Sequence, residues 1–142
     1  MEKFWSIAGA MSMVPTTSSA THLIDTVLPH LAGRVSGAAL RVPTASVSAV
    51  DLVAQLGRDM TCEGFATALA GAIDASPVMG RTDLPLVSSD LRSRPESIVL
   101  ASPETRMTGP RQVRVFGWYD NEWGFSARML DVAARMSGKT AT

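Results

Sequence analysis

Apolar side chains recur with two different periods along this chain, and the order of these periods constrains the fold most. The stretch RQVRVFGW alternates as a β-strand does, and it leads directly into the helical pattern GFSARMLDVAARM. On that helix Phe125, Met129, Val132, Ala133 and Met136 share one face. Strand-like and helical segments follow in irregular order. The pattern predicts an α+β fold, with one mixed, mostly antiparallel sheet and helices packed on one face.

The other expected helices have clear starts or stops. TTSSATHLIDTVLPHL offers hydroxyl residues for an N-cap, and Gly33 follows as a stop. TCEGFATALAGAI is expected to be a second helix, although Gly64 and Gly71 weaken it. We expect a single domain over residues 1–142, made of an apolar N-terminal segment (1–13), a core (14–137) and a tail (138–142).

Four further strands are expected, at SGAALRVP, SVSAVDLVAQL, LVSS and SIVL. In SVSAVDLVAQL the residues Val50, Leu52, Ala54 and Leu56 alternate with more polar neighbours. This alternation predicts that one face of the strand is packed.

Composition limits the classes of function. Hydrophobic residues form 46% of the chain and charged residues 18%, as in a folded protein. Thirteen basic and thirteen acidic residues cancel, so neither a nucleic-acid partner nor a membrane partner is expected. Cys62 is the single cysteine, which excludes an internal disulfide and a cysteine-based metal site. A cytoplasmic protein without a bound metal is the expectation, with Cys62 as a small buried residue.

The N-terminal stretch MEKFWSIAGAMSMVPTTSSAT loosely resembles a secretory signal. Glu2 cancels Lys3, however, and the stretch leads into a helix start, so we expect it to belong to the folded protein. Its aromatic residues, including Trp5, have two compatible interpretations: they cover a bare sheet surface, or they form a wall of a pocket for a hydrophobic ligand.

Three blocks, GAALRVPTASVSAVDL, PLVSSDL and WYDNEWGFSARMLD, resemble the C-terminal catalytic domain of the phosphorylating glyceraldehyde-3-phosphate dehydrogenases. The related erythrose-4-phosphate dehydrogenases are similar in the same places. The resemblance runs from about Val14 to Met136 with the spacing between blocks preserved. It implies that Ser18 and Ser19 replace an oxyanion-binding pair at a helix start, where free N–H groups favour an anion. It also places Arg41 on the substrate-phosphate arginine and Asn121 on the asparagine that meets the nicotinamide.

Other parts of such an enzyme have no counterpart here. No G-x-G-x-x-G motif follows a strand, and the family's nucleophilic cysteine and its activating histidine precede the matched region. Cys62 lies in a separate helical segment and does not replace that cysteine. We therefore expect no dehydrogenase activity from this chain alone, and no bound cofactor. Several residues also depart from the family pattern, namely His22, Arg81, Leu100, Phe125 and Ala127.

Each candidate residue also has a structural interpretation. Arg41 is either an anion anchor or the partner of Asp51 or Asp90 in a salt bridge. His22 is either an acid–base group or a surface residue of a first helical turn. Asp120 and Glu122 are either an acid–base pair or caps of the last helix. Trp118 and Trp123 are expected to be packing residues.

Three functions remain open. In the first, the chain is a free-standing domain that binds a small molecule with an acidic and an apolar part and catalyses non-redox chemistry in a biosynthetic pathway, such as isomerisation, elimination or cyclisation. His22, Arg41 and Glu122 would be catalytic, and Ser18, Ser19, Arg41, Asn121 and Trp5 would bind the substrate. In the second, it is one half of a split or fragmented NAD-dependent sugar-phosphate dehydrogenase. In the third, it is a non-catalytic binding domain. A homo-oligomer, a dimer, is expected in each case.

Overall fold

The computed structural model describes residues 12–18 and 20–138, and this part of the chain forms two compact units. One unit comprises Met1–Ala45 and the other Ser46–Thr142. No helix in the described ranges is long and apolar enough to cross a membrane.

The described part of the first unit, residues 12–18 and 20–45, contains a two-stranded antiparallel ribbon and one short α-helix. Strand β1 (Val14–Thr16) pairs with β2 (Ala39–Arg41), so that Val14 lies opposite Arg41 and Thr16 opposite Ala39. Helix α2 (Ala20–Val27) follows β1, and the 3-10 turn η1 (Pro29–Leu31) follows α2. The Asp25 carboxylate accepts a hydrogen bond from the N–H of Gly33, which has a φ of 68°. The helix expected to continue to Leu31 and stop at Gly33 instead ends at Val27, and Gly33 follows η1 in a conformation that glycine adopts without strain.

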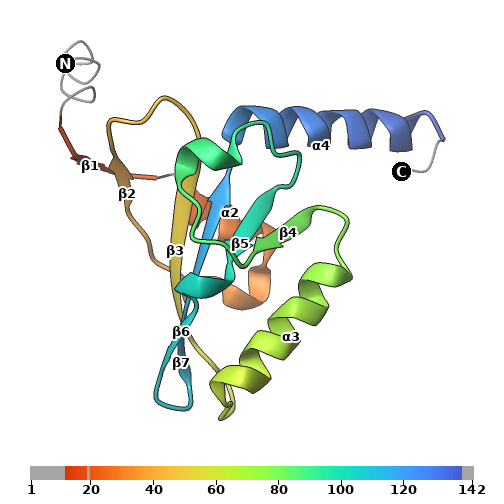
Figure 1. The fold of residues 1–142 in the computed structure, drawn as a ribbon. Helices are drawn as coiled ribbons and strands as arrows, with labels where there is room; N and C mark the ends of the chain where they lie inside the picture. The colour runs from red at the N-terminus through yellow and green to blue at the C-terminus, as the bar shows by residue number, and fades with distance from the viewer. Residues whose placement is uncertain (1–11, 19, 139–142) are drawn as a thin grey trace. The chain divides into compact units, whose positions relative to one another are not determined.

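The second unit is built around strand β7 (Gln112–Tyr119), which pairs with three other strands (Figure 1). The five-stranded sheet has the order β3-β7-β5-β4, and β6 (Arg106–Thr108) also pairs with β7. Strands β3 (Ser48–Gln55) and β5 (Ile98–Ala101) are antiparallel to β7, whereas β4 (Met79–Thr82) is parallel to β5. The sheet is therefore mixed and mostly antiparallel, and the predicted α+β fold is confirmed.

Two longer helices accompany this sheet. Helix α3 (Cys62–Asp74) begins at Thr61, whose hydroxyl accepts a hydrogen bond from the N–H of Gly64 at 3.0 Å. This cap offsets part of the helical cost of Gly64 and Gly71. Helix α4 (Asn121–Met136) follows β7 after one residue and extends away from the end of the sheet (Figure 1).

A small hydrophobic core lies between the sheet and the loops that follow β4. Val47, Leu91 and Val99 are buried together, and Leu86 and Trp118 pack against them. Val47 has a φ of 70°, which is strained for a β-branched residue. Val47 is only 7% exposed. The residue with this strained backbone, just before β3, is therefore packed in the core.

Several details differ from the sequence-based expectations. The segment LVSS is not a strand: Ser88–Leu91 forms the 3-10 turn η2, because the Asp90 carboxylate accepts a hydrogen bond from the N–H of Val87 and Leu91 turns into the core. Cys62 is exposed rather than buried, since it lies in the first turn of α3.

The packed face predicted for β3 is also wrong for this chain. Val50 is 38% exposed and Leu52 48% exposed, although they alternate as expected. The strand pairs with β7 along its length, but no described element of its unit covers these side chains well. The alternating apolar side chains of β3 therefore form an exposed apolar surface of this unit.

Candidate functional site

The turn between β7 and α4 is the most tightly held of the predicted site regions. Asp120 caps α4, and its Oδ1 accepts hydrogen bonds from the N–H groups of Trp123 at 2.9 Å and Glu122 at 3.2 Å. Its Oδ2 accepts a third from the N–H of Ser93 at 2.9 Å. The Asp120 side chain is buried. Two of these bonds cap the helix, and the bond from Ser93 joins the start of the helix to the loop at residues 92–97.

These donors also set the charge state of Asp120. The N–H groups of Trp123 and Ser93, and less strongly that of Glu122, lower the pKa of the Asp120 carboxyl from its ordinary value of 3.8. Burial opposes them, and Arg92 adds a smaller favourable charge. A carboxylate that accepts several N–H bonds stays ionised. Asp120 is therefore a fixed anion at the positive end of the helix, and the predicted capping role is confirmed.

Asn121 and Glu122 project from this fixed turn. Both are exposed residues in the first turn of α4, next to each other in the chain. The Asn121 amide offers both donors and an acceptor to a ligand. Glu122 does not form an acid–base pair with Asp120, because the Asp120 oxygens are occupied by backbone donors. Trp123 is 53% exposed, so the expectation that it packs is wrong within this chain, whereas Trp118 does pack in the core.

Ser18 and Arg41 lie in the first unit, at different ends of its ribbon. The Ser18 hydroxyl accepts a hydrogen bond from the N–H of Ala20 at 3.2 Å, at the start of α2. Arg41 is exposed and lies opposite Val14, whereas Ser18 follows the far end of β1. The register of the ribbon thus does not bring the two residues into one pair. Asp51 and Asp90, the other possible partners of Arg41, bind Arg114 and the N–H of Val87.

The remaining candidates cannot be placed in the same way. Trp5 and Ser19 lie outside the described residues. His22 belongs to α2, and its side chain lies outside the described part. Their roles stay predictions. Among the described residues no cluster of three or more histidine, cysteine or acidic side chains is suited to hold a metal ion.

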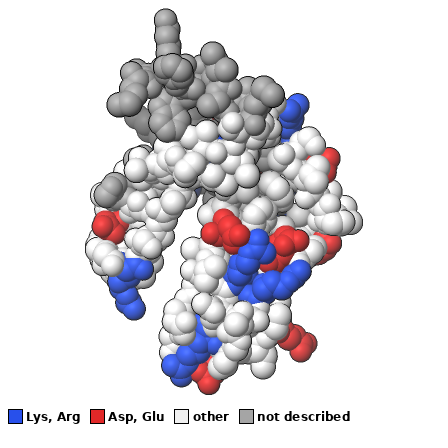
Figure 2. All heavy atoms as spheres, turned by 90° about the vertical axis from the view of Figure 1, so that its left-hand side faces the viewer, with Lys and Arg blue, Asp and Glu red and all other residues white. Residues whose placement is uncertain are grey.

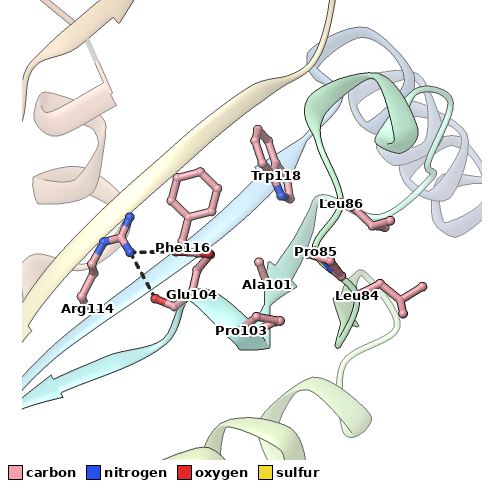
Figure 3. A pocket seen from close by; sticks show the side chains of 9 residues that line it. All are labelled: Leu84, Pro85, Leu86, Ala101, Pro103, Glu104, Arg114, Phe116 and Trp118. Atoms are coloured by element: carbon pink, nitrogen blue, oxygen red, sulfur yellow. Dashed lines mark hydrogen bonds and ion pairs between the residues drawn. The ribbon is translucent and has the colours of Figure 1, made fainter.

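A half-open pocket of about 230 Å³ lies on one face of the sheet in the second unit (Figure 3). Its lining comes from the loop after β4, from the end of β5 with the turn η3 (Ser102–Glu104), and from one face of β7. The lining residues are Leu84, Pro85, Leu86, Ala101, Pro103, Glu104, Arg114, Phe116 and Trp118. None of the predicted site residues is among them. Sequence reasoning missed this pocket, although the alternation of Arg114, Phe116 and Trp118 on β7 indicated a shared face.

The charge in this pocket is already neutralised. Arg114 forms a two-pronged ion pair with Asp51, at 2.8 Å and 2.9 Å, and a further contact with Glu104 at 3.2 Å. Its guanidinium also lies 5.4 Å from the centre of the Phe116 ring, which meets Trp118 edge to face. Since its donors are used by two carboxylates, Arg114 is poorly suited to bind a further anion. On the face shown in Figure 2, acidic and basic side chains lie next to each other rather than in areas of one sign.

Comparison with known proteins shows that the sequence of this chain is similar to members of one family. The model of the glyceraldehyde 3-phosphate dehydrogenase C-terminal domain matches residues 5–121. The chain is 45% identical over 131 residues to glyceraldehyde-3-phosphate dehydrogenase of Cereibacter sphaeroides, covering 91% of the chain and 39% of that relative. It is 42% identical to the enzyme of Pseudomonas aeruginosa, covering 92% of the chain and 39% of the relative. The glyceraldehyde-3-phosphate dehydrogenase 2 of Bacillus subtilis is 44% identical, with 92% of the chain and 40% of the relative covered.

The chain thus spans about two fifths of the length of these relatives. The matched region includes β1 to β7, the Asp120 turn and the first residue of α4. Fold, sequence blocks and family match agree over most of the chain. It belongs to the glyceraldehyde 3-phosphate dehydrogenase C-terminal domain family.

Proposed function

We propose that this chain supplies the substrate-holding and nicotinamide-facing groups of a phosphorylating glyceraldehyde-3-phosphate dehydrogenase. In this proposal Arg41 binds the substrate phosphate, the turn at Ser18 and Ser19 binds a second oxyanion, and Asn121 contacts the nicotinamide carboxamide. The nucleophile, its base and the dinucleotide-binding domain belong to the three fifths of the relatives that the chain does not span. Of the three functions considered from the sequence, this is the half-enzyme.

The single observation that carries the proposal is the Asp120 turn. A contact with a carboxamide needs an exposed amide in a fixed position, since an amide on a mobile loop would lose conformational entropy on binding. Asn121 is exposed, and the residue before it is buried and bonded to three backbone N–H groups. The residues present therefore fit one edge of a nicotinamide. NAD would accept a hydride when bound, and the role of this chain would be to orient its ring.

Arg41 suits a phosphate for a separate reason. It is the last residue of a paired strand, and its side chain is exposed. A guanidinium on such a strand presents its donors as a fork that fits a phosphate or carboxylate. By contrast, Arg114 is committed to Asp51 and Glu104. Among these two arginines, Arg41 is the better anion anchor.

The proposal is tested by completing the enzyme from two polypeptides. The full 142-residue chain is produced together with the part of the Cereibacter sphaeroides relative that precedes the matched region. NAD reduction is followed with glyceraldehyde 3-phosphate and phosphate. Activity is expected from the combination and from neither polypeptide alone. Two folded polypeptides that associate but show no activity would contradict the proposal.

Variants then assign the roles. In the active combination, Arg41→Ala should lower kcat/KM for glyceraldehyde 3-phosphate by about tenfold or more, because a charge-assisted fork to phosphate is lost. Arg34→Ala is the matched control, since Arg34 is an exposed arginine of the same unit. Asn121→Ala should raise KM for NAD more than KM for the sugar phosphate. If Arg41→Ala and Arg34→Ala lower kcat/KM equally, Arg41 does not bind the substrate phosphate.

The 142-residue chain by itself distinguishes the half-enzyme from the free-standing, non-redox domain. If the chain alone is stabilised against heat by phosphate or an apolar acid but not by NAD, and turns such an acid over without a redox change, then the non-redox domain is the better description. His22→Ala and Glu122→Ala would be the first variants for that chemistry.

A further inference from the structure

The loop at residues 92–97 contacts helix α4 at three positions that are four residues apart along the helix. The contacting pairs are Asp120 with Ser93, Gly124 with Glu96, and Arg128 with Ser97. Residues four apart lie above one another on one face of an α-helix. One face of α4 therefore rests on this loop, and Asn121 belongs to the first turn of that contact.

Gly124 allows the backbones of the helix and the loop to approach closely. It is buried, and a Cβ atom at this position would lie 3.0 Å from the carbonyl oxygen of Glu96 and 3.9 Å from Cα of Ser97. A methyl group there would force the helix and the loop apart by a few tenths of an ångström. The missing side chain at residue 124 therefore sets the distance between α4 and the loop.

The apolar side chains of α4 contribute little to this contact. Phe125, Met129 and Val132 share one face of the helix, and each of them is more than half exposed. Most helices are held on a protein by burial of such an apolar face. The placement of α4 on its unit depends more on the three contacts with the loop, among them the 3.3 Å hydrogen bond from Arg128 to Oγ of Ser97.

The loop itself is anchored to the sheet at strand β4. The Ser97 N–H donates a hydrogen bond of 2.8 Å to the carbonyl of Val78, directly before β4. The Arg94 guanidinium donates a hydrogen bond of 3.0 Å to the Glu96 carboxylate. This carboxylate lies over Gly80 of β4, where a Cβ atom would come within 3.0 Å of Oε1. The loop therefore connects the position of the sheet to the position of the helix.

We infer that the loop at residues 92–97 positions Asn121, and that Gly124 is a positioning residue through its contact with Glu96. The cap at Asp120 fixes the direction of the helix start, whereas the loop contacts fix its distance from β4. A displacement of α4 away from the loop would carry the Asn121 amide with it. The consequence of such a displacement for nicotinamide binding rests on the proposed function, but the positioning of Asn121 does not.

Nuclear magnetic resonance tests the positioning in the full chain. Asn121 is the only asparagine in the sequence, so a chain labelled with a heavy nitrogen isotope in asparagine alone gives the signals of this one side-chain amide. Pro95→Gly loosens the loop without removing its three contacts, because proline restricts φ and glycine does not. Pro110→Gly is the matched control, since Pro110 is also an exposed proline between strands of the same unit.

The Asn121 signals should shift or broaden in Pro95→Gly and stay unchanged in Pro110→Gly. Signals that stay unchanged in both variants, or change equally in both, would overturn the inference. If either variant does not melt cooperatively, the comparison is made from the helix side. Arg128→Met removes the donor to Ser97, and Arg135→Met, at an exposed position of α4, is its control.

Kinetics of the active two-polypeptide combination test the role of Gly124. Gly124→Ala should raise KM for NAD by about threefold or more, because a displacement of a few tenths of an ångström misplaces the amide, and should leave KM for glyceraldehyde 3-phosphate unchanged. Gly71→Ala is the matched control: Gly71 lies inside α3, and no atom lies within 4 Å of a Cβ atom built there. Equal effects of the two variants on KM for NAD would overturn the role of Gly124.

The two experiments separate this inference from the proposed function. An inactive combination would contradict the proposed function alone, because the resonance comparison uses the 142-residue chain by itself. If the Asn121 signals respond to Pro95→Gly but Asn121→Ala leaves KM for NAD unchanged, the loop positions Asn121 and the proposed nicotinamide contact is wrong.

Discussion

Asp120 and Ser93 are joined by a hydrogen bond of 2.9 Å between the Asp120 carboxylate and the Ser93 N–H, across 27 residues of sequence. The bond fastens the start of α4 to the loop that precedes β5. Ser93 has a φ of 62°, so the loop adopts a left-handed conformation at the residue that donates this bond. The position of Asn121 therefore depends on a distant loop as well as on its own helix.

The first prediction concerns this carboxylate. Asp120→Ala should lower the free energy of unfolding by about 1–3 kcal/mol, because the helix loses its N-cap and buried N–H groups lose their acceptor. Urea titration of the second unit's transition measures the loss. The control is Glu122→Ala, an exposed residue of the same turn, which should change the free energy by less than about 0.5 kcal/mol. Equal losses for both would show that the three bonds do not stabilise the turn.

The second prediction concerns acid. The pKa of Asp120 is lowered in the folded state from 3.8, so the unfolded chain binds a proton first as the pH falls. The stabilisation from Asp120 is therefore complete above that unfolded value and is lost as pH falls through the lowered folded pKa. In Asp120→Asn the amide oxygen can still cap the helix but carries no charge. The unfolding free energy of this variant should depend less on pH below about 4. Parallel curves for the two proteins would contradict the assigned pKa shift.

The third prediction concerns the loop. Ser93→Gly should raise the free energy of unfolding by about 0.5–1 kcal/mol, since glycine adopts a positive φ without the steric cost that serine bears, and its N–H still reaches Asp120. Ser89→Gly serves as the comparison. Ser89 lies in the turn η2 without a positive φ, so glycine should be neutral or destabilising there by up to about 1 kcal/mol. Thermal melts distinguish the two directions.

The fourth prediction concerns close packing in the sheet. A Cβ atom at Gly117 would lie 2.7 Å from Cδ1 of Ile98 and 3.0 Å from Cδ2 of Leu100. Gly117→Ala should therefore destabilise the unit by about 1–3 kcal/mol through overpacking. Ile98→Ala makes space for the new methyl group, so the double variant should be more stable than the sum of the single changes predicts. If the losses of unfolding free energy from Gly117→Ala and Ile98→Ala simply add, the overpacking at residue 117 does not come from its contact with Ile98.

Elements with strong periodicity were predictable from the sequence. Strand β7 and helix α4 have clean alternation and a clean helical stripe, and both form where expected. Strand β4 was missed, because Gly80 and Arg81 break its apolar pattern and its pairing comes from β5. The turn at Ser88–Leu91 was mistaken for a strand because Leu86 and Val87 resemble the start of one.

Only those features of the candidate site that depend on residues close together in the sequence were predictable. A helix start at Asp120 could be inferred from the residue types, and Asn121 and Glu122 lie there as exposed residues. The bond from Ser93 could not be inferred, because its donor is a backbone N–H far away in the chain. The pairing of Arg114 with Asp51 depends in the same way on the register between β3 and β7.

The place of β7 in the sheet has a consequence for synthesis of the chain. Among the described strands, β3 and β6 pair only with β7, and β5 pairs with both β4 and β7. All three are synthesised before β7. Among the described strands of the second unit, only the parallel pair β4–β5 is complete before β7 emerges. At a typical translation rate of about 5–20 residues per second, the apolar strand β3 stays unpaired for several seconds. The nascent chain is therefore most exposed to misassembly during this interval, and a chaperone that holds extended apolar segments would act on β3 first.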